Sequence, residues 1–138
     1  MNAITKVFDA VMDLITALDL YAIPVIGAMP PENGIAAQIS TGATDTTFLN
    51  KGVEIGLSIV LNAKHASQQT ALDTLNLIHQ SLIMRKNYPN TDEYQIVDIR
   101  TDSFPNYIGR EDKQYLYGSA LRVRAFIKVV EPTPDPEA

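Results

Sequence analysis

The sequence predicts an α+β domain in which two helices pack on one face of a single, mainly antiparallel sheet of four strands. Two patterns support this fold class. Apolar residues recur at helical spacing in two segments, and they alternate with other residues at a period of two in four more. The predicted order is helix, strand, strand, helix, strand, strand, which is typical of an α+β fold with its helices on one side of the sheet.

The first helix is predicted to begin near Ile4 and to end near Tyr21. Asn2 is a candidate cap for its first turn. The apolar face consists of Val7, Phe8, Val11, Leu14, Ile15 and Leu18. Pro24 disfavours helical geometry at the residue before it, so we expect the helix to stop upstream of this proline.

Two strands are predicted after the Pro-rich turn at residues 30–34. Residues 35–39 form a short alternating segment with one face in water, and residues 53–61 alternate almost without interruption. We therefore expect the second strand at the centre of the sheet. Between the two, residues 41–52 are rich in Thr and Gly and are expected to form a long loop.

The second helix is predicted from an N-cap at Ser67 to about Arg85. Its core face consists of Ala71, Leu72, Leu75, Ile78, Leu82 and Ile83. Leu77 and Met84 lie on the opposite, polar side of the helical wheel. They are either isolated surface residues, which are common on monomers, or a subunit contact.

The second half of the chain is expected to contain two strands joined by a polar loop. Residues 94–101 alternate without a cleanly polar face, which predicts burial on both faces or cover by a neighbouring subunit. Residues 115–129 form a long last strand. On its outer face, Arg122 and Arg124 are expected to pair with acids such as Glu54 or to contact an acidic neighbouring subunit, and phosphate contact is a third alternative.

Two predicted loops carry large apolar residues that are candidates for contact with a partner. The candidates are Phe48 and Leu49 in the loop before the central strand, and Phe104, Tyr107, Ile108 and Arg110 in loop 104–112. The alternatives are ordinary. The first pair can fold back onto the core, and the second loop can be a simple connector between strands.

One domain accounts for residues 1–130, and residues 131–138 are expected to form an extended tail because prolines occupy alternate positions there. The apolar stretch at residues 10–29 is interrupted by Asp13 and Asp19. Proline within this stretch would also break a spanning helix. We therefore expect neither a membrane span nor a secretory signal.

The composition argues against catalysis and against a bound cofactor. The chain has no cysteine and a formal net charge of −5, so thiolate chemistry is excluded and sequence-specific nucleic-acid binding is not expected. Its two histidines, His65 and His79, lack metal-ligand spacing, and His79 is expected to be partly buried and hydrogen-bonded. Paired carboxylates occur only in predicted loops. The sequence predicts no enzyme, no metal and no cofactor.

The second half of the chain resembles the small tail-terminator and minor capsid proteins of long-tailed bacteriophages. The resemblance rests on the order helix, strand, polar loop and last strand, and on two stretches of sequence. These stretches are Tyr94-Gln95-Ile96-Val97-Asp98-Ile99 and Phe104-Pro105-Asn106-Tyr107-Ile108-Gly109. The N-terminal helix and residues 41–52 carry no such match.

The resemblance implies a structural protein of the virion head-tail junction, assembled in the host cytoplasm without a membrane. Identical subunits would form a ring, a hexamer in related systems, that ends the tail tube and provides the surface where the head joins. Its partners would be the tail tube protein and head-tail connector proteins. A minor capsid or tail-completion protein is one alternative. A small ligand-binding α+β domain is another, and an enzyme using dispersed carboxylates is the third.

Overall fold

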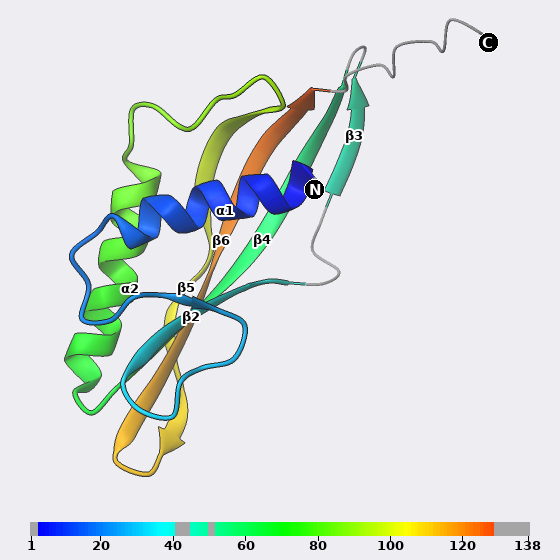
Figure 1. Cartoon of the computed structure of the whole chain (residues 1–138). Helices are drawn as coiled ribbons and strands as arrows, with labels where there is room; N and C mark the ends of the chain where they lie inside the picture. Colours follow the sequence, from blue (N-terminus) through cyan, green and yellow to red (C-terminus); the bar gives the residue numbers. More distant parts are fainter. Residues whose placement is uncertain (1–2, 41–44, 50–51, 129–138) are drawn as a thin grey trace, which may run out of the picture.

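The computed structural model describes residues 3–40, 45–49 and 52–128. Two helices lie on one face of a single sheet (Figure 1). The elements are α1 (Ala3–Thr16), β1 (Val25–Ile26), β2 (Gly34–Ile39), β3 (Asp45–Leu49), β4 (Gly52–His65), α2 (Gln68–Ile83), β5 (Tyr94–Glu111) and β6 (Gln114–Lys128). The prediction of an α+β fold with two helices and one sheet is confirmed. The predicted tail, residues 131–138, lies outside the described residues.

Within the described residues, the sheet is mixed and has six strands, in the order β1-β2-β4-β6-β5 with β3 pairing with β4 beside this path. β1 runs parallel to β2, and the other described pairings are antiparallel. The predicted count of four strands is therefore wrong. The two additional strands are short segments without clear alternation, and they become strands because β2 and β4 offer them hydrogen-bonding partners in the folded protein.

Strand β4 is central, as predicted, because β2 and β3 pair with one of its edges and β6 with the other. The alternate side chains of β4 that face the helices are Ile55, Leu57, Ile59, Leu61 and Ala63, all of them buried. They form one core with α1, α2 and the matching side chains of β5 and β6. The hydrophobic core therefore lies between the helices and one face of the sheet.

Helix α1 ends at Thr16, five residues before the predicted end. Its buried face consists of Val7, Phe8, Val11, Met12 and Ile15. Tyr21 instead turns toward the sheet, where its hydroxyl lies 2.7 Å from the carbonyl oxygen of Gly34 and 2.9 Å from that of Lys64. Burial raises the pKa of Tyr21 to about 12. This anchor on β2 and β4 explains why the chain leaves helical geometry early.

The predicted wet face of β2 is exposed at Gln38 but wrong at Ala36, which is buried. Gly34 and Ala36 share one face, since side chains two apart in a strand point the same way. A Cβ at Gly34 would lie 2.9 Å from the side chain of Pro30. The Pro-rich turn therefore folds over the face of β2 that the sequence pattern assigned to water.

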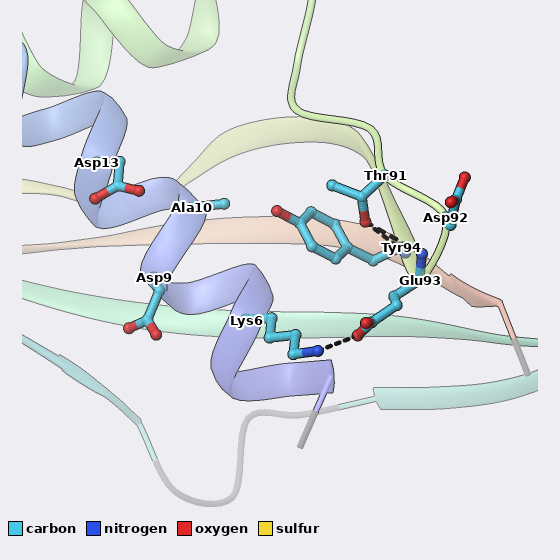
Figure 2. Close-up of a pocket in the computed structure, with 8 residues that line it drawn as sticks. All are labelled: Lys6, Asp9, Ala10, Asp13, Thr91, Asp92, Glu93 and Tyr94. Atoms are coloured by element: carbon cyan, nitrogen blue, oxygen red, sulfur yellow. Dashed lines mark hydrogen bonds and ion pairs between the residues drawn. The ribbon is translucent and has the colours of Figure 1, made fainter. Parts of the chain in front are cut away.

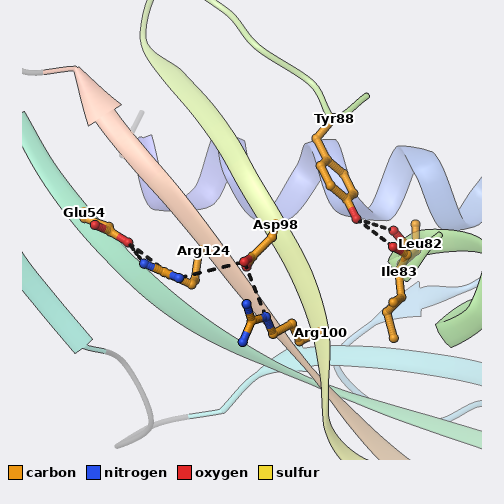
Figure 3. Close-up of polar contacts among 7 residues, drawn as sticks. All are labelled: Glu54, Leu82, Ile83, Tyr88, Asp98, Arg100 and Arg124. Carbon is orange, nitrogen blue, oxygen red and sulfur yellow. Dashed lines mark hydrogen bonds and ion pairs between the residues drawn. The ribbon is translucent and has the colours of Figure 1, made fainter. Parts of the chain in front are cut away.

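Helix α2 begins where predicted, at the Ser67 cap, whose side chain accepts a hydrogen bond from the backbone N–H of Thr70 at 3.2 Å. Ile83 was predicted in the core but is exposed. It is the last residue of the helix, and beyond it the chain turns away. The hydroxyl of Tyr88 then donates a hydrogen bond to the carbonyl oxygen of Leu82 at 2.7 Å, which satisfies one of the free carbonyls at the helix end (Figure 3).

The predicted polar loop at residues 104–112 is also wrong, because β5 continues to Glu111 and only Asp112 and Lys113 form the turn. Asp112 has a φ of 53°, the left-handed conformation that a tight turn requires. The pairing of β5 with β6 contains four register shifts. Pro105 and Gly109 fall within these irregularities, where strands tolerate such residues, so they do not end the strand.

Candidate subunit interface

The face of the sheet opposite the helices is the first candidate interface. Both described helices pack on the other face (Figure 1), so the remaining alternate side chains of β4, β5 and β6 lie on a surface that neither helix covers. Arg122 and Arg124 project from β6 on this side, as predicted, opposite Ser58 and Gly56 of β4. Such a surface can contact another chain.

An ion-pair network crosses this face from β4 to β5 (Figure 3). The Nε atom of Arg124 donates to Glu54 at 3.0 Å, and one of its terminal nitrogens lies 3.8 Å from Asp98. Asp98 also pairs with Arg100 at 3.4 Å. The hydrogen bond to Glu54 raises the pKa of Arg124. The predicted pairing of this face with Glu54 is confirmed for Arg124, while contact with a neighbouring subunit stays a prediction.

Arg122 lies flat against the neighbouring strand. A Cβ at Gly56 would be 2.8 Å from its guanidinium, so the missing side chain of this glycine makes room for the arginine. Arg122 is half-buried as a result. This packing holds the guanidinium against the sheet.

The far half of β5 exposes three large apolar side chains. Phe104 is 79% exposed, and Tyr107 and Ile108 are each about half-exposed. The ring of Tyr107 meets that of Tyr117 edge-on with centroids 5.6 Å apart. A Cβ at Gly118 would collide with Ile108 at 2.3 Å, so Ile108 lies across the bare backbone of that glycine. These residues are presented from a strand, although the sequence placed them in a loop.

Arg110 plays a local part in the hairpin. Its guanidinium lies over the ring of Tyr115, 5.3 Å from the centroid, and its Nε atom donates to the carbonyl oxygen of Asp112 at 3.0 Å. Both contacts brace the turn between β5 and β6. A role of Arg110 in partner contact stays a prediction.

The other predicted interface residues lie apart from the hairpin. Leu77 and Met84 are exposed on α2, and Met84 is 71% exposed as the cap residue of the helix. Phe48 and Leu49 belong to β3, where they lie opposite Val53 and Gly52, so the predicted loop is partly a strand. Their side chains lie outside the described part of the structure.

Sequence reasoning missed two exposed isoleucines at the opposite edge of the sheet. Ile23 is 78% exposed and Ile26 is 60% exposed. They lie in and just before β1, a strand of two residues that has no periodicity of its own. The available signal was the occurrence of branched apolar residues in a Pro- and Gly-containing segment that fits neither a helix nor a strand pattern.

An acidic cleft of about 440 Å³ lies between α1 and residues 91–94 (Figure 2). Asp9, Asp13, Asp92 and Glu93 line it, and Lys6 pairs with Glu93 across it. Such a cleft favours a cationic group over an anionic one. Within the described ranges, no group of three or more His, Cys, Asp or Glu residues is arranged to hold a metal ion.

His79 is buried and hydrogen-bonded, as predicted. Its Nδ1 atom lies 3.0 Å from the hydroxyl oxygen of Thr101, and its Nε2 atom lies 2.8 Å from that of Ser119. Burial lowers the pKa of His79 to about 4, so the ring is neutral at physiological pH. The neutral ring joins α2 to β5 and β6. This arrangement is that of a structural histidine.

No family model matches the chain, and no curated protein matches it either. Among solved structures, the chain is similar to one from the virion of a native gene transfer agent (GTA) particle, with a TM-score of 0.56. The two chains share a fold. The alignment covers 89% of this chain and 91% of that chain at 11% sequence identity. A likeness at this identity extends to the fold alone. None of the described helices has the length and apolar character needed to cross a membrane.

Proposed function

We propose that the protein is a structural virion protein, a subunit of a ring that terminates the tail tube of a phage-like particle and forms the surface where the head joins. One observation carries the proposal: the fold is shared, over nearly the whole length of both chains, with a component of a gene transfer agent virion. The resemblance of the second half of the chain to phage tail-terminator proteins points to the same kind of particle.

The mechanism is geometric and requires no catalysis. A subunit with one rigid core and a second, uncovered sheet face can repeat a single heterologous contact until a ring closes. The closed ring then offers one surface to the tail tube protein and another to the head-tail connector proteins. A net charge of −5 suits a channel through which DNA passes without binding.

A minor capsid or tail-completion protein is the second candidate. The likeness to a gene transfer agent virion supports it equally, because that description names the particle and no position within it. Both roles place the protein in the virion, and they differ in the stage at which assembly fails without it.

The test is negative-stain electron microscopy of particles made with this gene disrupted, alongside particles made after the gene is restored. Overlong tails without heads are the expected result, because tube growth would have no stop. Normal tails beside detached, filled heads would indicate that the protein joins the head to the tail and does not terminate the tube. Intact particles would refute the proposed function, and recovery on restoring the gene controls for effects on neighbouring genes.

A further inference from the structure

We propose that the contact between neighbouring subunits joins the two opposite edges of the sheet, β5 of one copy against β1 of the next. The proposal rests on the proposed function, because a ring of identical subunits makes a second copy the occupant of the surface. It adds which surfaces meet and in which orientation. Four observations on the described residues support it.

Both outer edges of the sheet expose large apolar side chains. We call Ile23 and Ile26 the β1 edge, and Phe104, Tyr107 and Ile108 the β5 edge. In the described strand order, β1 and β5 are the terminal strands. A contact between the two edges would therefore cover apolar surface on both, and it would use a different surface on each copy.

The two edges lie at the same level along the strands. One row of paired residues crosses the whole sheet at this level: Val25, Ala36, Asn62, Gly118 and Asn106. Ile26 is the residue after Val25 in β1, and Tyr107 is the residue after Asn106 in β5. β3 pairs with the other end of β4, so it does not cover β1 (Figure 1). A sideways displacement of one copy brings the two apolar edges together without a shift along the strands.

Two of the three side chains at the β5 edge are already held in place by β6. Tyr107 is held by the ring of Tyr117, and Ile108 lies across Gly118, so little side-chain freedom remains to be lost on association. The register shifts of β5 interrupt its outer row of backbone groups. A partner strand cannot extend the ladder regularly along such an edge, so we expect side chains to make the contact.

The charges around the two edges favour a head-to-tail arrangement. Residues 17–40, which surround β1, contain Asp19 and Glu32 and no Lys or Arg. Residues 94–128, the β5–β6 hairpin, contain six Lys and Arg against four Asp and Glu. A β1–β1 contact would bring only acidic side chains together, whereas β5 carries Arg100 and Arg110 as well as acids, so a β5–β1 contact can pair opposite charges.

The test compares the self-association of purified full-length variants by sedimentation velocity over a series of concentrations. Phe104→Asp blocks the β5 edge and Ile26→Asp blocks the β1 edge. Each variant alone should associate at least ~10-fold more weakly than the natural protein, because a charge would be buried in an apolar contact. An equimolar mixture should form a dimer and nothing larger, since only one intact pair of edges remains.

The comparison variant is Met84→Asp, which introduces the same charge at the exposed position on α2 that the sequence offers as the rival subunit contact. Met84 caps the end of α2 distant from Gln68, whose side chain contacts Tyr117 near the β5 edge. This variant should associate like the natural protein. Circular dichroism spectra and melting curves of all three variants exclude a failure to fold.

Three outcomes would overturn the proposal. Dimerisation of Ile26→Asp alone would indicate a symmetric β5–β5 contact, and loss of association only in Met84→Asp would move the contact to α2. A natural protein that stays monomeric at every concentration would leave the edges without the proposed partner. The proposed function is tested separately by the gene disruption. Intact particles there would refute it, whether or not the purified protein associates in solution.

Discussion

The two faces of the same sheet differ in what they contribute to the molecule. Strands β4 and β6 send alternate side chains to each face. On the covered face, Ile59 and Leu121 are fully buried under the helices. On the uncovered face, Glu54 and Arg124 form an ion pair that is partly open to water. Around this ion pair the uncovered face therefore contributes less to stability than the covered face, whereas nearer the Pro-rich turn Lys64 is buried on it.

The largest expected effect separates the two faces on a single strand. Leu121→Ala removes a fully buried side chain on the covered face and should lower the free energy of unfolding by about 3–5 kcal/mol. Leu116→Ala makes the same change on the opposite face of β6, where the side chain is only half-buried, and should cost less than half as much. Urea unfolding of both variants measures the difference. Equal losses would mean that the two faces contribute alike.

The next effect concerns the polar exception within the covered face, His79. Its pKa is about 4 in the folded protein and 6.5 for an unperturbed histidine. Between these pH values the unfolded chain binds a proton that the folded protein excludes. The neutral ring therefore stabilises the fold fully above pH 6.5, and this stabilisation is lost as the pH falls toward 4. Once the pH is well below 4, the free energy of unfolding has fallen by about 3 kcal/mol for this reason.

His79→Gln tests this contribution, because glutamine does not titrate and can still hydrogen-bond Thr101 and Ser119. Urea unfolding of both proteins at pH 7 and at pH 4.5 gives the loss of stability for each. The natural protein should lose more stability than the variant, and titration of the carboxylates cancels in the comparison. Parallel losses would show that the buried ring does not resist protonation.

The smallest effect is expected on the uncovered face. Arg124→Gln removes the ion pairs with Glu54 and Asp98, but exposed ion pairs contribute little because water and salt screen them. The melting temperature should stay within the scatter of replicate measurements, at low and at high salt. A clear drop that salt abolishes would show that the network stabilises the fold, and the contrast between the faces would weaken.

Local patterns predicted much of the molecule. Ser67 marks the start of α2, the alternation of β4 identifies the central strand, and the position of His79 on the helix predicts its burial. Each of these depends on residues close together in the chain. The errors arose where distant residues decide the outcome, as for Pro105, which reads as a loop residue until β6 supplies a partner strand.

The candidate interface was likewise predicted in part from the sequence. The apolar character of Phe104, Tyr107 and Ile108 is visible in the sequence, and their exposure was predicted. Their position at an edge was not, and the exposure of Ile23 and Ile26 at the other edge was missed entirely. Nothing near those two isoleucines distinguishes an exposed residue from a core residue, because their burial depends on which strand lies beside them.

By itself, the sequence determined the fold class, most of the core face of each helix and the central strand, because the period of apolar residues is a local property that survives in any compact structure. The tertiary structure alone decided the number of strands, the strand order and the level at which the two apolar edges face outward. Those features follow from pairing between residues as far apart as Val25 and Asn106, and register across a sheet is set by the partners rather than by either segment alone.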